Sequence, residues 1–129
     1  MEGSLKLKEI SYIHSESYAA GELKHGTISL ITDDMPVIAV ATQRDVLDKT
    51  VSNIKEVKSR GAFTIVVTRE GTDFDKDVAD ILVTVPETDD LLMPMTAVVP
   101  LQLIAYYTAD LRGNDVDKPR NLAKSVTVE

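Results

Sequence analysis

The sequence predicts an α/β domain in which helices flank a mainly parallel β-sheet. The run 37–41 is continuously apolar, as in strands that are buried in a parallel sheet, and the mostly apolar runs 62–68 and 80–85 indicate two more buried strands. An amphipathic helical pattern separates the first two runs, and a long apolar helical pattern follows the third. Strands and helices joined by short connections are typical of a domain built on a parallel sheet.

The first segment has the pattern of a helix. Leu7, Ile10 and Ile13 recur at helical spacing, and no proline interrupts the stretch from Gly3 to about Ala20. We therefore expect a helix over that stretch. The charged residues Glu22–Gly26 follow as a loop, before a short apolar piece.

The next elements predict a strand, a helix and a second strand. A cluster of turn residues at 32–36 precedes the apolar run 37–41. Apolar positions between 46 and 57 then mark one face of a helix, and Gly61 is placed to end it. The second strand, 62–68, begins immediately after that glycine.

The third strand and the last helix complete the predicted domain. Pro86 closes the strand at 80–85, and Leu101–Arg112 has a helical pattern that Gly113 stops. Pro100 suits the first turn of this helix, or a kink if the helix begins earlier. Three strands make a narrow sheet for this class, so we expect the domain to lack a strand that would precede residue 1.

Composition excludes several classes of function. The net charge of −7 over 129 residues disfavours nucleic acid and anionic membranes as partners. The chain contains no cysteine, which excludes disulfides, thiolate zinc sites and a cysteine nucleophile, and its two histidines make a transition-metal site improbable. No glycine-rich phosphate loop follows a strand. We expect no metal or cofactor, and a cytoplasmic location because the chain has neither a signal peptide nor a membrane-spanning run.

A few polar residues are candidates for chemistry. Lys6 and Glu9 lie three residues apart, so both face the same side of a helix. They form either an exposed ion pair or a general base with a lysine that positions it. His25 lies beside Gly26 in the predicted loop, where it is either an ordinary surface histidine or part of a site. We expect His14 to be structural or to face solvent.

The last sixteen residues, 114–129, show no periodicity. They carry Lys118, Arg120 and Lys124 in an otherwise acidic chain. This segment is either a frayed terminus or a flap that brings positive charge and an amine to an anionic ligand. A lysine with a lowered pKa, held near a carbonyl, can form a Schiff base.

Two stretches, LKLKEISYIHSESYAAGELKHG and DVDKPRNLAKSVTVE, resemble the isomerase region of the glutamine–fructose-6-phosphate aminotransferase family. They have the expected order and separation, and the resemblance runs from residue 2 to Glu129. It implies a three-layer, flavodoxin-like sugar-isomerase (SIS) subdomain at 1–113, without its first strand, and a C-terminal active-site tail at 114–129. In this family the region converts fructose 6-phosphate and glutamine-derived ammonia to glucosamine 6-phosphate.

The resemblance also assigns roles to single residues. Glu9 falls on the glutamate that moves a proton between the first two sugar carbons, and His25 on the histidine assigned to ring opening at the neighbouring subunit's site. Lys124 falls on the lysine proposed to form a Schiff base with the open-chain ketose. Thr27 stands where the family has a proline.

Substrate binding and partners follow from the same resemblance. It implies that three further residues contact the sugar phosphate: Lys6, Arg120 and Ala123. The family's glutaminase domain and first SIS subdomain, which holds the phosphate-binding loops, are expected as partners, together with a second copy of the chain. Alone, this fragment is expected to be inactive. The alternative is a non-catalytic SIS module that binds phosphosugars to regulate a partner.

Overall fold

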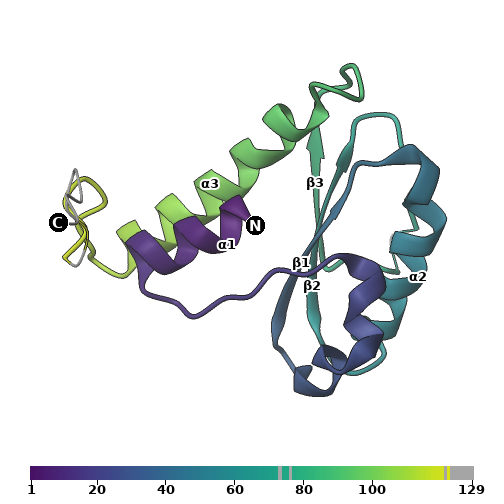
Figure 1. Cartoon of the computed structure of the whole chain (residues 1–129), viewed down its shortest axis with the longest axis horizontal. Coiled ribbons are helices and arrows are strands. Elements are labelled where there is room, and N and C mark those ends of the chain that lie inside the picture. The colour runs from purple at the N-terminus through teal and green to yellow at the C-terminus, as the bar shows by residue number, and fades with distance from the viewer. Residues whose placement is uncertain (73, 76, 121, 123–129) are drawn as a thin grey trace, which may run out of the picture. The chain divides into compact units, whose positions relative to one another are not determined.

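The computed structural model describes residues 1–72, 74, 75, 77–120 and 122, and Figure 1 shows the course of the chain. These residues form two compact units. The first, called the helical unit here, joins residues 1–17 to residues 101–129. The second, called the sheet unit, is residues 18–100.

The sheet unit contains a parallel sheet with the order β1-β2-β3. Its strands are β1 (Pro36–Ala41), β2 (Phe63–Arg69) and β3 (Ile81–Val85). The central strand β2 is almost entirely buried, whereas its two neighbours form the edges of the sheet. The α/β class and the parallel pairing predicted from the apolar runs are therefore confirmed.

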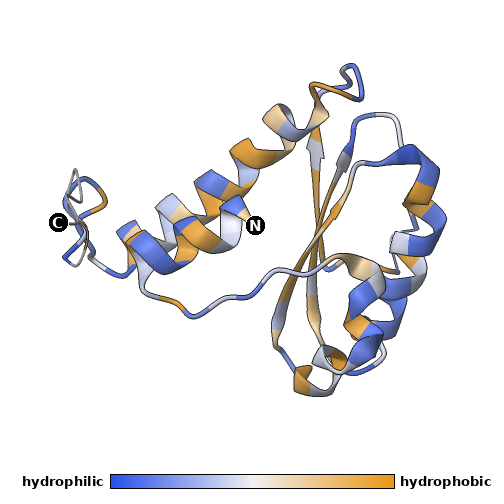
Figure 2. Cartoon of the chain, viewed as in Figure 1, coloured by the Kyte–Doolittle hydropathy of each residue, from blue (hydrophilic) through white to orange (hydrophobic). Residues whose placement is uncertain are grey.

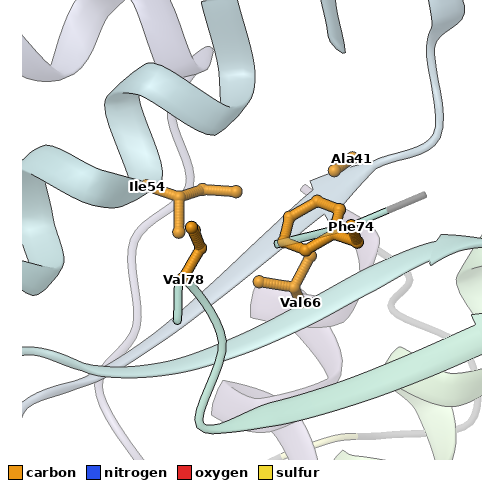
Figure 3. Packing of buried hydrophobic residues seen from close by; sticks show 5 residues of the cluster. All are labelled: Ala41, Ile54, Val66, Phe74 and Val78. Carbon is orange, nitrogen blue, oxygen red and sulfur yellow. The ribbon is translucent and has the colours of Figure 1, made fainter. Parts of the chain in front are cut away.

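Helix α2 (Leu47–Lys58) connects β1 to β2 and packs on both strands. A short 3-10 turn precedes it, and it ends close to the glycine that the sequence indicated. Figure 2 shows a helix that is largely hydrophilic beside strands that are largely hydrophobic. Figure 3 shows Ile54 of α2 pointing toward Val78, with the ring of Phe74 beside Val66 of β2. These buried side chains form the core of the sheet unit.

Gly61 is required by the turn between α2 and β2. Its φ of 89° is a left-handed conformation that favours glycine. A β-carbon there would lie 2.0 Å from Asp33 Oδ1. The Asp34 N–H donates to the Gly61 carbonyl at 2.8 Å, so the turn is tied directly to the segment that enters β1.

The helical unit begins with a shorter helix than the sequence predicted. Helix α1 (Glu2–Lys6) passes into a π-helical turn (Leu7–Ser11), and Tyr12 then adopts a left-handed conformation with φ 58°. The predicted continuation to Ala20 is wrong. The chain instead folds back, because the hydroxyls of Ser4 and Ser15 each donate to the other residue's carbonyl oxygen, at 3.0 and 2.9 Å.

The segment after that turn also differs from the prediction. Ala20–His25 forms a 3-10 helix where a loop was expected, and Thr27–Leu30 forms a second one. Gly26 separates them with φ 140°. These two helices are only six and four residues long, which is too short for a periodic pattern of apolar residues to indicate them in the sequence.

The last helix, α3 (Met93–Leu111), begins eight residues before the predicted start at Leu101. Pro100 therefore lies inside the helix and not in its first turn, which agrees with the alternative that the helix begins earlier. The boundary between the two units falls after this proline. In the described part of the chain no helix is long and apolar enough to cross a membrane.

In the helical unit, α1 packs closely on the second half of α3. A β-carbon on Gly3 would lie 2.8 Å from Leu101 Cβ, which is closer than non-bonded carbon atoms approach in folded proteins. The two segments, nearly a hundred residues apart in sequence, therefore meet through a position that has room only for hydrogen.

Candidate functional site

Lys6 and Glu9 form the closest ion pair of the helical unit's first segment. The Lys6 ammonium donates to Glu9 Oε2 at 2.6 Å and also lies 3.8 Å from Glu2 Oε1. The hydrogen bond to Glu9 raises the pKa of Lys6, against the opposing effect of partial burial. The Glu9 side chain is 25% exposed, so this carboxylate is partly shielded while it remains accessible from solvent.

Glu9 lies within the π-helical turn, which a buried hydrogen bond and a left-handed residue at its end define. Ser11 is fully buried, and its hydroxyl donates to the Leu7 carbonyl oxygen at 2.6 Å. Tyr12 then ends the turn in its left-handed conformation. π-helical turns and left-handed non-glycine residues are frequent at functional sites. The local backbone thus marks the stretch that carries Glu9.

The chain after α3 returns to this same stretch. The Asn114 side chain donates to the Ile10 carbonyl oxygen at 3.3 Å. Farther along, the Arg120 guanidinium stacks on the Tyr12 ring, 4.1 Å from its centroid, and the Arg120 N–H donates to the Tyr12 hydroxyl at 2.9 Å. Arg120, which was predicted to bind substrate, contacts Tyr12 through both its side chain and its backbone.

Two predicted site residues, Ala123 and Lys124, lie outside the described residues. Their assigned roles in substrate binding and Schiff-base formation remain predictions.

His25 belongs to the sheet unit. It ends the first 3-10 helix, and its Nδ1 lies 2.8 Å from Glu22 Oε2. The imidazole is 71% exposed, so it is open to solvent on most of its surface. Thr27, where the resemblance led us to expect a proline, donates its hydroxyl proton to the Leu23 carbonyl oxygen at 3.3 Å. That hydrogen bond closes the turn around Gly26.

His14 faces solvent, as one of the two sequence interpretations held. Its side chain is 84% exposed and its Nε2 lies 3.7 Å from Glu16 Oε1. The residue follows the π-helical turn and is not inside a helix as the sequence suggested.

A buried arginine closes the carboxyl end of the sheet. Arg69, at the end of β2, donates to the Thr42 carbonyl oxygen at 2.6 Å and to Glu87 Oε1 at 2.8 Å, and it also pairs with Asp90. Burial alone would lower the pKa of Arg69, but its hydrogen bonds to Asp90 and Glu87 outweigh that effect and raise it. Ligands of open α/β sheets usually bind at this end. Among the described residues, the ion pairs of Arg69 with Glu87 and Asp90 occupy this end of the sheet.

A shallow depression beside α2 also offers no anion site. It is lined mainly by Lys55, Lys58, Asp75 and Asp77. Lys55 Nζ lies 3.1 Å from Asp75 Oδ2, and Lys58 Nζ lies 2.6 Å from Asp80 Oδ1, so both lysines are paired with carboxylates. No group of three or more potential metal ligands gathers among the residues that the structure describes.

Sequence reasoning missed three polar residues that the structure connects to the predicted site. Tyr12 and Asn114 join the Glu9 segment to the chain after α3, and Glu22 lies against His25. Only the last of these had a local signal, since Glu22 and His25 are three residues apart. The other two contacts join residues more than a hundred positions apart, which no spacing rule detects.

The chain matches the family profile described as "SIS domain" over residues 1–111. It is 58% identical over all 129 residues to a glutamine–fructose-6-phosphate aminotransferase (isomerizing) of Symbiobacterium thermophilum, and 57% identical to one of Thermococcus kodakarensis. The chain spans 21% of the length of each of these curated relatives.

Solved structures give the same picture. The C-terminal domain of glucosamine-fructose-6-phosphate aminotransferase from Francisella tularensis superimposes with a TM-score of 0.79 and 42% identity, over 88% of this chain and 32% of that one. A glucosamine-6-phosphate deaminase from Thermotoga maritima gives 0.74 and 27%, over 98% of this chain and 35% of that one. The SIS match covers most of the sequence, and its structural neighbours share the parallel sheet with flanking helices. The chain therefore belongs to the SIS domain family.

Proposed function

We propose that this chain forms part of the isomerase region of a glutamine–fructose-6-phosphate aminotransferase, in which it supplies residues that convert fructose 6-phosphate to glucosamine 6-phosphate. The observation that carries the proposal is the 58% identity to a relative of that name, in an alignment that includes all 129 residues of the chain. The geometry around Glu9 supports the same reaction.

Glu9 is the proposed base. Exchange of a ketose for an aldose needs one group that removes a proton from the first sugar carbon and returns it to the second. The carboxylate takes the proton, becomes a carboxylic acid and then gives the proton back, so it ends the step unchanged. The Lys6 ammonium, 2.6 Å from Glu9 Oε2, holds the carboxylate in one orientation through this oxygen.

His25 is the proposed group for opening the sugar ring. An imidazole with a pKa near 6.5 can both take and give a proton near neutral pH. Glu22 lies 2.8 Å from His25 Nδ1 and fixes the orientation of the ring. The exposure of the imidazole suits a residue that completes a site formed with another polypeptide segment.

Lys124 is the proposed amine that condenses with the open-chain ketose. The amine attacks the carbonyl carbon, water leaves, and a Schiff base remains that ammonia can later displace. Ala123, Lys6 and Arg120 are the proposed substrate-binding residues around it.

The proposed partners are the parts of the relatives that this chain does not span. We propose that the glutaminase domain delivers ammonia and that the first SIS subdomain holds the sugar phosphate. In a dimer, His25 would enter the site of the second copy of this region. Light scattering after size exclusion tests the last point, since a clean monomer contradicts it for the isolated chain.

A chimeric enzyme tests the proposal directly. The 129-residue chain is grafted into the Symbiobacterium thermophilum relative in place of its matching segment. We expect the chimera to form glucosamine 6-phosphate from fructose 6-phosphate and glutamine. Changing Glu9→Gln should lower kcat by about a hundredfold or more, because the base is lost while its shape is kept.

The matched control is Glu16→Gln, which makes the same change in a more exposed carboxylate of the same unit. It should leave kcat near that of the unaltered chimera. A folded chimera that binds fructose 6-phosphate without forming product would instead favour the regulatory, non-catalytic module. Equal activity of Glu9→Gln and the control would contradict the proposed role of Glu9.

A further inference from the structure

The return of the chain to the Glu9 stretch begins at the end of α3. Gly113 takes a left-handed φ of 71°, and the Asn114 N–H donates to the Ala109 carbonyl oxygen at 3.0 Å, which closes the helix. The Asn114 side chain then donates to the carbonyl oxygens of Ile10 and Ser11, at 3.3 and 3.5 Å. These carbonyls belong to the last residues of the π-helical turn, where no further turn supplies partners. The segment therefore starts on the end of the Glu9 turn.

The next residues form hydrogen-bonded turns. Asp115 Oδ1 accepts from the N–H groups of Asp117 and Lys118, at 2.9 and 3.1 Å. Such a side-chain-to-backbone turn fixes the direction of the chain locally. The Leu122 N–H donates to the Pro119 carbonyl oxygen at 3.2 Å. The path toward Arg120 is thus defined by its own hydrogen bonds.

Tyr12 holds Arg120 through two different groups. Its ring faces the guanidinium, 4.1 Å from the ring centroid, and its hydroxyl accepts from the Arg120 backbone N–H at 2.9 Å. The first contact needs the charge and planarity of arginine. The second holds the main chain itself, whatever the side chain does. One tyrosine therefore fixes both the direction and the position of the chain at residue 120.

This contact limits how far the following residues can travel. Lys124 follows Arg120 by four positions, so an extended chain lets their α-carbons lie at most about 14 Å apart. If Asn114 were the last fixed point, ten residues would allow up to about 36 Å.

We propose that Tyr12 is a positioning residue that anchors the C-terminal segment at Arg120 and so keeps Lys124 within reach of the turn that carries Glu9. The inference rests on the proposed function for the roles of Lys124 and Glu9, but the anchor itself does not. Tyr12 follows Glu9 by three positions. The same short stretch of chain therefore carries the proposed base and contacts Arg120, four positions before the proposed amine of Lys124.

Trypsin tests the anchor without any enzymatic activity. The protease cuts after Arg120 and after Lys124, whereas Pro119 protects the bond after Lys118. In the intact 129-residue chain, mass spectrometry compares the initial rates at which residues 121–129 and 125–129 are released. The second rate is an internal reference. Cleavage after Arg120, relative to that reference, should rise several-fold in Tyr12→Leu and by less in Tyr12→Phe, which keeps the ring.

Tyr107→Leu is the matched control. Tyr107 lies on α3, is 57% exposed and contacts Tyr106. It should leave the cleavage ratio unchanged. Circular dichroism checks that each variant is folded, and Tyr12→Phe remains informative if Tyr12→Leu does not fold. An unaltered ratio in a folded Tyr12→Leu, or in Tyr12→Phe when the leucine variant fails to fold, overturns the anchor.

The chimeric enzyme tests the consequence for chemistry. Fructose 6-phosphate is added with borohydride, which reduces a Schiff base to a stable amine on Lys124. We expect Tyr12→Leu to slow this trapping several-fold at saturating sugar, because the last fixed point of the chain before Lys124 would then lie farther from it in sequence. The effect should fall on kcat more than on KM, because the tether positions the amine and not the phosphate.

The outcomes separate the two proposals. If the unaltered chimera gives no adduct on Lys124, the proposed Schiff base is wrong, and the trypsin ratio still decides whether Tyr12 anchors the segment. If the unaltered chimera and Tyr12→Leu give the adduct at equal rates, the positioning role is wrong while the proposed function stands.

Discussion

The sheet unit and the helical unit are held together in different ways. In the sheet unit, buried side chains from α2, β2 and the loop after β2 form a local apolar core. In the helical unit, a segment from the start of the sequence meets one from its end where Gly3 lies against the Leu101 side chain, and through a few polar contacts at Tyr12 and Asn114. The first unit depends on bulk apolar burial, and the second on fit at a few positions.

The difference shows where function can be placed. Residues of the sheet unit that could bind a ligand at the carboxyl end of the strands are paired with each other, as at Arg69 and Glu87. In the helical unit, Glu9 stays partly exposed in a π-helical turn that its neighbours hold. The apolar core described above therefore lies in the sheet unit, whereas the proposed base lies in the helical unit.

The largest effect is expected in the core of the sheet unit. Ile54→Ala removes a side chain that is 3% exposed and packs near Val78. The loss of burial and the cavity left behind should lower the free energy of unfolding by about 3 kcal/mol. Urea denaturation followed by circular dichroism measures it. A loss below about 1 kcal/mol would mean that the core of this unit is not the main source of its stability.

A smaller effect is expected where the two segments of the helical unit meet. Gly3→Ala places a carbon 2.8 Å from Leu101 Cβ, and the backbones must separate to admit it. The gain in helix propensity offsets only part of the strain, so we expect a net loss of about 1–2 kcal/mol. Hydrogen exchange should quicken for amides of α1 and leave those of β2 unchanged. Equally faster hydrogen exchange in α1 and β2 would mean that the two units are not stabilised independently.

The smallest effect concerns acid. The Lys58 ammonium, together with the backbone and hydroxyl of Thr64, lowers the pKa of Asp80 from its ordinary 3.8 to about 2. A carboxyl whose pKa is lower when folded stabilises the protein above its unfolded pKa, and this stabilisation is lost as the pH falls from about 4 to about 2.

Asp80→Asn should therefore flatten the decline of stability across that interval. Thermal melts at a series of pH values measure it, and Asp45→Asn, an exposed carboxylate of the same unit, is the control. An unchanged slope in Asp80→Asn would mean that the Lys58 contact contributes nothing in solution.

The sheet could be predicted from the sequence because its signals are local. The runs that became β1, β2 and β3 are short and mostly apolar, and Gly61 marked the end of α2. The first helix was overextended because Ile13 continues the apolar spacing, while the left-handed turn at Tyr12 has no local signature. The start of α3 was placed late because Pro100 is compatible both with a first turn and with a helix interior.

The candidate site was predicted only where its residues are neighbours in sequence. Lys6 and Glu9 were paired by their spacing, and the structure places them in contact. Arg69 was overlooked because an arginine at the end of an apolar strand reads as exposed, whereas its partners Glu87 and Asp90 come about twenty residues later. Only the folded chain brings such groups together.

The arginine at the end of β2 also bears on the order of folding. Its partners come from the end of β1 and from the connection after β3, so the guanidinium finds them only when all three strands are aligned. Contacts that form after the main barrier change the unfolding rate and leave the folding rate nearly untouched. We therefore expect Arg69 to slow the unfolding of the sheet more than it speeds its folding.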